Sequence, residues 1–411
     1  MCSRSQIISL FLALAFASAS VSAQSTDRRS KPDSNKTDEF GHSLKQYGRS
    51  KRQKSPKPQP KASEPDDDSI RIETNLVAID FMVANKSGSL IRGLTRDDIV
   101  ITEDGVPQKI EMFSFANSES RPRSIVLILC NHLMQGPILE TSKAATRNLI
   151  QLLGDKDEMA VVTSDMRVRQ SFTSDKKRLY EAIDAVSVNI DDFNSEWDAL
   201  LAVLNELFGE SDRQRIVVFQ GDGSRSIWLK PDGTEPIKIS RSTRDRTGYP
   251  YGREKMIRPF GFRDVEDAIS SSGATIYSVI TFDRMLGKPS KEQLEIAIRN
   301  RTRIGQHYGW GDASDRPAIA EYYKYADVEI YLSGQSAMFA IAQFSGGYAD
   351  FIENPADANR IYSDISKVLD NRYSVGYYPL NQERKGKTRQ IRIEIRDHPE
   401  LIVSARKSYV F

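Results

Sequence analysis

Residues 124–136 read Ser-Ile-Val-Leu-Ile-Leu-Cys-Asn-His-Leu-Met-Gln-Gly, and they carry the clearest signal for the fold. The first half is an apolar run, which is typical of a buried strand in a parallel sheet. The second half follows directly, at the place where an open α/β sheet usually binds its ligand. Cys130, His132 and Met134 therefore begin the search for a functional site.

The region around this stretch, residues 122–370, alternates predicted strands with predicted helices, which favours an α/β fold with a mostly parallel sheet. We expect strands at 124–130, 158–164, 215–220, 274–281 and 348–352. We expect helices at 137–153, 175–187, 195–209, 263–272, 290–303, 335–345 and 355–371.

Shorter strands flank this region on both sides. Residues 70–118 contain alternating apolar patterns and an Asp104-Gly105 hairpin signal. Residues 371–411 contain three more predicted strands. Because three or four strands make a thin module, we predict that both sets join in one β-sandwich.

The N-terminus has the pattern of a secretory signal peptide, predicted at residues 1–23. An apolar run, Ile7–Ala17, precedes small residues in Val21-Ser-Ala23. A membrane anchor is the alternative, but the run is short for a bilayer. Cleavage would leave Cys130 as the sole cysteine and no internal disulfide, which fits a secreted or periplasmic protein with no transmembrane helix.

Residues 24–69 are polar and rich in Pro and Lys, so we expect a disordered linker. Lys45–Lys61 carries seven Lys or Arg and no acidic residue. A basic arm that contacts an anionic surface is the alternative interpretation.

Four stretches resemble a known family. They are Gly93-Leu-Thr-Arg-Asp-Asp-Ile-Val-Ile-Thr-Glu-Asp-Gly-Val-Pro-Gln-Lys-Ile, Gln343-Phe-Ser-Gly-Gly-Tyr, and the closing pair Arg372-Tyr-Ser-Val-Gly-Tyr-Tyr-Pro and Ala405-Arg-Lys-Ser-Tyr. Together they resemble the acidobacterial von Willebrand factor type A (VWA)-related family over about residues 70–411. The resemblance implies a Rossmann-like sheet wrapped by helices, with a metal-ion-dependent adhesion site at the strand ends.

The implied adhesion site binds a hard divalent cation through Asp-x-Ser-x-Ser, a Thr and a further Asp. In this sequence Cys130 falls at the first Asp, His132 and Met134 at the two Ser, and Asn194 approximately at the Thr. Asp222 is the match to the last Asp. Because hard cations bind oxygen ligands, we predict that the metal site is degenerate, with no metal and no cofactor.

Cys130, His132 and Met134 are residue types that suit a soft metal such as copper or zinc. A zinc site needs three or four such ligands, so we favour packing of Cys130 and Met134, with His132 as a bystander. A soft-metal or redox role for Cys130 remains the third and weakest functional hypothesis.

The sequence favours a protein that is not an enzyme. It contains no Gly-x-Ser-x-Gly elbow, His-Glu-x-x-His or Cys-x-x-Cys motif. A formal charge of +2 argues against a nucleic-acid-binding protein, as does the predicted export.

A basic, aromatic segment follows Asp222. Residues 224–263 hold ten Lys or Arg against four acidic residues. Long loops of this kind are usually functional or disordered, so we weigh a partner-binding loop against an insertion without ligand. The candidate contacts are Arg225, Trp228, Arg241, Arg244, Arg246, Tyr249, Tyr251, Arg253 and Arg258. A second insertion, Arg299–Tyr325, is expected at the same rim.

The sequence thus predicts an exported protein for protein binding or adhesion, whose partner is a protein or an anionic surface. The rival hypothesis is a scaffold subunit of an envelope complex. Oligomeric state is not predicted.

Overall fold

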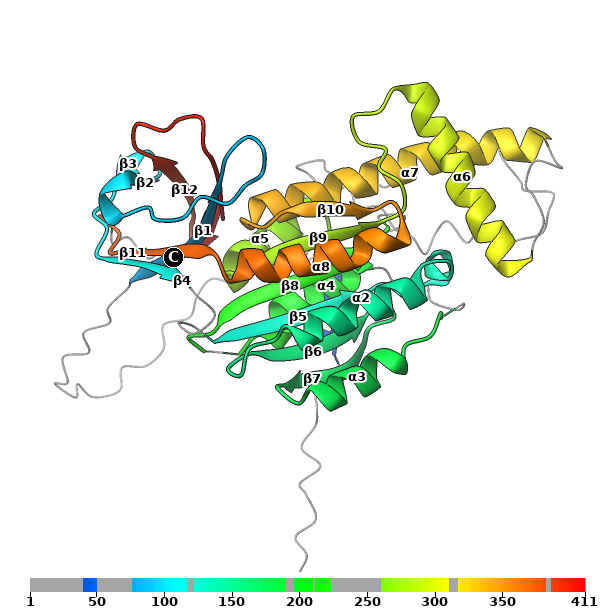
Figure 1. The fold of residues 1–411 in the computed structure, drawn as a ribbon, viewed down its shortest axis with the longest axis horizontal. Coiled ribbons are helices and arrows are strands. Elements are labelled where there is room, and N and C mark those ends of the chain that lie inside the picture. Colours follow the sequence, from blue (N-terminus) through cyan, green and yellow to red (C-terminus); the bar gives the residue numbers. More distant parts are fainter. Residues whose placement is uncertain are drawn as a thin grey trace, which may run out of the picture. The chain divides into compact units, whose positions relative to one another are not determined.

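The computed structural model describes residues 40–49, 76–116, 122–189, 196–209, 211–222, 260–309, 317–381 and 386–410. Glu39–Phe411 forms one compact unit, whose elements are labelled in Figure 1. Of the helices in these ranges, none combines the length and the apolar character that crossing a membrane requires.

A six-stranded sheet forms the centre of this unit, in the order β10-β9-β8-β5-β6-β7. All neighbours pair in parallel except β6 and β7, which are antiparallel. The strands are β5 (Arg123–Leu129), β6 (Glu158–Thr163), β7 (Arg167–Thr173), β8 (Gln214–Gly221), β9 (Thr275–Thr281) and β10 (Ala349–Ile352). The predicted α/β class and mostly parallel sheet are confirmed, and β7 is a strand that the sequence analysis missed.

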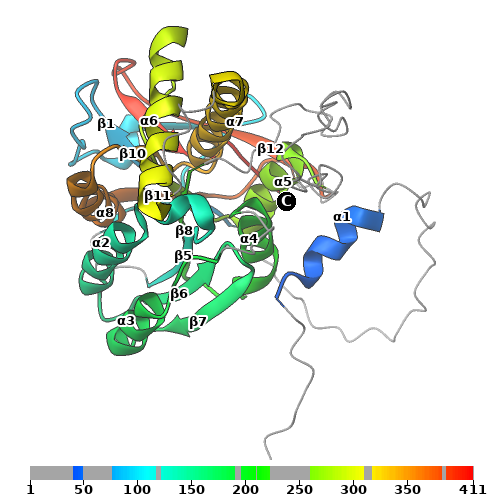
Figure 2. The same ribbon diagram turned by 90° about the vertical axis from the view of Figure 1, so that its right-hand side faces the viewer.

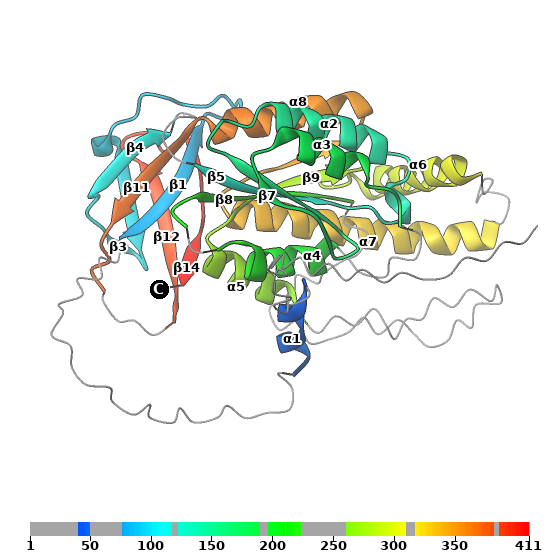
Figure 3. The same cartoon turned by 90° about the horizontal axis from the view of Figure 1, so that it is seen from below.

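Helices cover both faces of this sheet (Figure 3). One face packs against α2 (Leu139–Gln151), α3 (Lys176–Asp184) and α8 (Pro355–Leu369). The other packs against α4 (Glu196–Ala202), the π-helical η4 (Val203–Leu207), α5 (Phe262–Ser272) and α7 (Pro317–Phe344). Each strand of the sheet centre therefore buries both of its faces, which explains the uninterrupted apolar run of β5.

Two helices are longer than predicted. Helix α6 (Ser290–Tyr308) packs against α7, and the latter begins at Pro317 rather than near residue 335. The expected insertion at Arg299–Tyr325 is therefore largely helical in the part that the structure describes. Met134 and Tyr308 pack on a small core between them, around Phe282 and Met285.

The strands at the two ends of the chain form the predicted β-sandwich. Its sheets have the orders β13-β1-β11-β4 and β14-β12-β2-β3. The strands are β1 (Val77–Ala84), β2 (Ile99–Glu103), β3 (Val106–Pro107), β4 (Met112–Ala116), β11 (Arg372–Tyr377), β12 (Thr388–Ile395), β13 (Ile402–Ala405) and β14 (Ser408–Val410). The hairpin at Asp104-Gly105 turns with positive φ at both residues, 49° and 82°.

The sandwich is joined to the central sheet through buried polar contacts. The Arg372 guanidinium is 1% exposed and donates to the Tyr277 hydroxyl at 2.6 Å and to the Asp80 carbonyl at 3.0 Å. Gly346 and Gly347 pass so close to neighbouring backbone that a Cβ on Gly347 would lie 1.9 Å from the Ile276 carbonyl oxygen. The stretches that begin at Gln343 and Arg372 thus supply contacts that hold the sandwich against the central sheet.

The expected disordered linker at 24–69 is wrong for Phe40–Arg49. Here η1 (His42–Leu44) and α1 (Lys45–Arg49) lie beside α4, as Figure 2 shows. Both Gly41 and Ser43 donate backbone N–H groups to the Glu206 carboxylate, each at 2.8 Å. Leu44 and Tyr47 pack on the core under α4 and α5, so a local amphipathic pattern outweighs the polar composition.

Candidate functional site

The candidate site lies where the strand order of the central sheet changes direction. In chain order the strands β5 to β10 read 3-2-1-4-5-6 across the sheet, with the change between β5 and β8. Ligands of open α/β sheets bind at the carboxyl ends of the strands at such a switch point. Cys130 follows β5 and Asp222 follows β8, so the structure brings these two predicted residues together.

The backbone after β5 is fixed by contacts with both neighbouring strands. Cys130 N donates to the Gln220 carbonyl of β8 at 3.1 Å. Asn131 N donates to Ser164 Oγ at 3.1 Å, and the same hydroxyl donates to Asn131 Oδ1 at 3.0 Å. The side chains of Cys130 and His132 are thereby held toward the interior, where they are 0% and 1% exposed.

His132 is held at both ring nitrogens. Its Nδ1 accepts the backbone N–H of Met134 at 3.1 Å, and its Nε2 lies 3.3 Å from Asp222 Oδ1. Because a nitrogen that accepts a hydrogen bond carries no proton, we assign the proton to Nε2, facing Asp222. His132 is therefore a partner of Asp222, and its expected role as a bystander is wrong.

Glu196 is a member of this site that the sequence analysis missed. It is the first residue of α4, fully buried, and its carboxylate, Cys130 Sγ and a ring nitrogen of His132 all lie within 4.8 Å of one another. Its side chain packs beside Gly221, where a Cβ would lie 3.4 Å from Glu196 Cγ, an ordinary contact distance. An acidic residue in a first helical turn is usually solvated, so its position in the sequence did not reveal it.

The pKa values of the cluster reflect burial and mutual charge. Burial raises the pKa of Cys130, as do the nearby Glu196 and Asp222, so the group is a neutral thiol at neutral pH. Burial lowers the pKa of His132 and the neighbouring Asp222 raises it, with a net rise. Nδ1 nevertheless accepts the Met134 N–H, and this hydrogen bond requires the neutral imidazole.

The other predicted site residues lie elsewhere. Met134 packs on the small core around Phe282. Asn194 lies outside the described residues. The same holds for the candidate loop contacts, which are Arg225, Trp228, Arg241, Arg244, Arg246, Tyr249, Tyr251, Arg253 and Arg258.

The side chains at the strand ends do not fit a hard divalent cation. Mg²⁺ and Ca²⁺ are bound by oxygen atoms, at near-octahedral geometry in the case of Mg²⁺. The cluster has two carboxylates, Glu196 and Asp222, rather than the single one counted from the sequence. A thiol and an imidazole occupy the remaining positions, and these are poor ligands for such ions.

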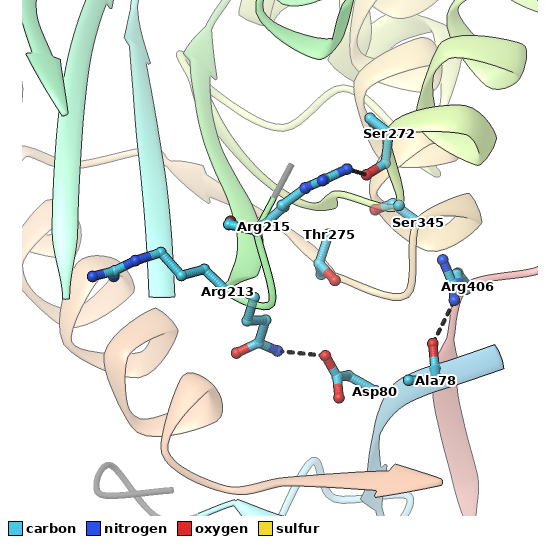
Figure 4. A pocket seen from close by; sticks show the side chains of 11 residues that line it. Ala78, Asp80, Arg213, Arg215, Ser272, Thr275, Ser345 and Arg406 are labelled. Carbon is cyan, nitrogen blue, oxygen red and sulfur yellow. Dashed lines mark hydrogen bonds between the residues drawn. The ribbon is translucent and has the colours of Figure 1, made fainter. Parts of the chain in front are cut away.

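A pocket of about 170 Å³ lies at the opposite edge of the sheet, at the starts of β8 and β9 (Figure 4). Arg215 donates to the Ser272 carbonyl at 2.7 Å, and Gln214 donates to Asp80 Oδ2 at 3.1 Å. Arg406 donates to the Ala78 carbonyl, while Arg213 extends away from these groups. Because the Gln214–Asp80 bond connects the central sheet with the sandwich, we interpret this pocket as part of the domain junction.

No family model matches the sequence, and no curated protein matches it. Among solved structures, the chain is similar to BatB from Bacteroides thetaiotaomicron, with 12% identity, a TM-score of 0.33, and coverage of 61% of this chain and 100% of that one. The chain is also similar to the vWF domain of the type V pili tip protein Mfa5 from Porphyromonas gingivalis, with 10% identity, a TM-score of 0.34, and coverage of 61% of this chain and 95% of that one. A third similar structure is a von Willebrand factor type A protein from Catenulispora acidiphila, with 9% identity, a TM-score of 0.34, and coverage of 74% of each chain. Similarity this weak does not bear on function, and the fold rests on the strand order above.

Proposed function

We propose that this protein is an exported, non-enzymatic binding protein for adhesion, built on a VWA-type domain whose hard-cation site is degenerate. The observation that carries the proposal is the position of Cys130, His132 and Asp222. They stand at the carboxyl ends of β5 and β8, where the family resemblance implies the adhesion metal, with a thiol and an imidazole among the side chains.

Two structural features support the family assignment within this proposal. The strand order 3-2-1-4-5-6 with an antiparallel edge strand agrees with the Rossmann-like sheet that the resemblance implies. The motif residues Gly346 and Arg372 meet at the domain junction, where the guanidinium reaches the glycine carbonyl at 3.3 Å.

The chemistry of Cys130 supports a role without catalysis. Reactive cysteines have a lowered pKa and are accessible, because the thiolate is the nucleophile. Cys130 is 0% exposed and burial raises its pKa. A thiol in this state is a poor nucleophile.

The partner-binding element in this proposal is the segment between Asp222 and Phe260, which follows the end of β8 in the sequence. Its arginines and aromatic residues are the types that dominate interface energetics. Their charge favours an anionic surface on a protein or an envelope polymer.

Affinity capture from envelope extracts tests this function. The full chain and a variant lacking residues 228–258 are immobilised, and capture is repeated without added Mg²⁺ and Ca²⁺. We expect the full chain to retain a defined partner in both buffers and the deletion variant to lose it. Equal capture by both chains would contradict the role of the loop, and capture that requires Mg²⁺ or Ca²⁺ would contradict the degenerate site.

A scaffold subunit is the second candidate function, favoured by the edge of the sandwich. β4 ends its sheet, and Met112, Phe115, Tyr378 and Leu380 beside it are 38%, 37%, 46% and 67% exposed. Exposed edge strands with apolar side chains favour assembly with another chain. If Phe115→Lys disrupts a complex that the loop deletion leaves intact, the scaffold function is the better account.

A further inference from the structure

Three groups that commonly bind transition metals converge at the switch point: Cys130 Sγ, a ring nitrogen of His132 and the Glu196 carboxylate lie within 4.8 Å of one another. Asp222 adjoins this cluster through His132 Nε2, 3.3 Å from its Oδ1, and all four residues are at most 1% exposed. We propose that this cluster is a binding site for a borderline divalent metal of the Zn²⁺ class. The site does not depend on the adhesion role proposed above.

The spacing of the groups is close to that of a tetrahedral zinc site. Zinc lies about 2.0–2.3 Å from its N, O and S ligands, so two ligand atoms on one ion lie about 3.5 Å apart. The His132 and Asp222 atoms are already 3.3 Å apart. Cys130, His132 and Glu196 lie within 4.8 Å of one another, so a movement of about an ångström would bring these three groups onto one ion.

The types of ligand atom select the class of metal. A thiolate, formed when Cys130 releases its proton to solvent on metal binding, and an imidazole favour Zn²⁺, Co²⁺ or Cu²⁺ over Mg²⁺ and Ca²⁺. The two carboxylates add negative charge, which a divalent cation would compensate in a buried site. The resemblance implies oxygen ligands for a hard cation, whereas this cluster contains a sulfur and a nitrogen ligand. We therefore interpret the difference as a change in the class of metal that is bound.

Metal binding would exchange one hydrogen bond. Nδ1 of His132 now accepts the Met134 N–H at 3.1 Å, with the proton on Nε2. Coordination through Nε2 moves that proton to Nδ1, where it faces the Met134 N–H. The η3 turn (Leu133–Gln135) must then shift, so the Met134 amide reports metal binding directly.

Burial and the number of ligands point to a structural role. With Asp222, which contacts His132, as the fourth ligand, the tetrahedral ion would be filled, as in structural zinc sites, with no position for a substrate. The ion would connect the ends of β5 and β8 with the start of α4.

The test uses the full chain without a polyhistidine tag, stripped with a chelator and then titrated with Zn²⁺ or Co²⁺ against a chromophoric competitor. We expect one metal per chain and, with Co²⁺, a near-ultraviolet charge-transfer band from the thiolate. The Met134 amide resonance should shift with the same stoichiometry. The absence of stoichiometric binding, or a Co²⁺ complex without the thiolate band, would overturn the proposal.

The metal affinities of single-site variants distinguish residues that bind the ion from carboxylates that only lie nearby. Cys130→Ser should remove the charge-transfer band, and both it and Glu196→Gln should weaken binding at least about tenfold. Asp165→Asn is the matched control, because Asp165 is a carboxylate at the end of the adjacent β6 that bonds Arg169 at 2.8 Å instead. Its affinity should equal that of the wild type. Wild-type affinity in a folded Cys130→Ser or Glu196→Gln protein would contradict the assignment.

Discussion

Nε2 of His132 lies 3.3 Å from Oδ1 of Asp222, and this contact joins the ends of two adjacent parallel strands in the interior of the protein. The two residues come from β5 and β8, on either side of the switch point. The pair therefore uses the ligand-binding position of the sheet for a buried internal contact.

Asp222→Asn tests the strength of this contact in the chelator-treated protein. Removal of one partner of a buried charge-assisted contact leaves the other without compensation, so unfolding should require about 2–4 kcal/mol less free energy. Chemical denaturation measures the change. Asp155→Asn, an exposed acid before β6, is the control and should change stability by less than about 0.5 kcal/mol. Equal effects of the two substitutions would show that the contact contributes nothing.

Arg372→Met tests the domain junction. The substitution leaves the Asp80 carbonyl and the Tyr277 hydroxyl without the guanidinium that they now contact, at a cost of about 2–4 kcal/mol. We also expect the sandwich and the α/β region to unfold in separate transitions, visible by calorimetry. Arg392→Met, on the exposed face of β12, is the matched control and should behave as wild type. A single unchanged transition in Arg372→Met would refute the role of Arg372.

Gly347→Ala tests the close approach of backbone behind the Gln343 motif. The new Cβ would lie 1.9 Å from the Ile276 carbonyl, so β9 or the chain before β10 must move. We expect a loss of about 3 kcal/mol or more. At Gly209 a Cβ meets nothing within 4 Å, and Gly209→Ala should be nearly neutral. Comparable thermal stability of both variants would be incompatible with the packing described.

Glu206→Gln tests the docking of Phe40–Arg49. The carboxylate accepts the N–H groups of Gly41 and Ser43, and an amide can accept fewer hydrogen bonds. Docking should weaken by about 1–2 kcal/mol, seen as faster hydrogen exchange over Phe40–Arg49. Glu181→Gln, which is exposed on α3, should leave that exchange unchanged. Exchange that is already fast in the wild type would show that the segment is not docked.

The apolar strands and their connecting helices could be predicted from sequence because each strand of the sheet centre is buried on both faces. β7 could not, because Arg167, Arg169 and Gln170 give it no apolar run. The start of α7 was missed for a similar reason, since its strongest apolar pattern begins well after Pro317. The segment Phe40–Arg49 was missed because the polar composition of residues 24–69 as a whole outweighed the few apolar residues that pack on the core.

At the site, the sequence located Cys130, His132 and Asp222 because each follows or ends a strand of recognisable pattern. Glu196 could not be predicted, since its burial depends on the approach of α4 to the end of β8 across Gly221. The orientation of Met134 likewise depends on α6, whose packing no local pattern encodes. Contacts between distant elements thus decide the composition of the cluster.

The most direct test of the degenerate site is the thermal unfolding of the chelator-treated full chain with and without millimolar Mg²⁺ or Ca²⁺. A functional hard-cation site at 100 times its Kd would stabilise the protein by about 2.7 kcal/mol. For a chain of this size that is a rise in Tm of about 3 °C. We predict no rise with either ion. A rise of this size that Asp222→Asn abolishes would contradict the account.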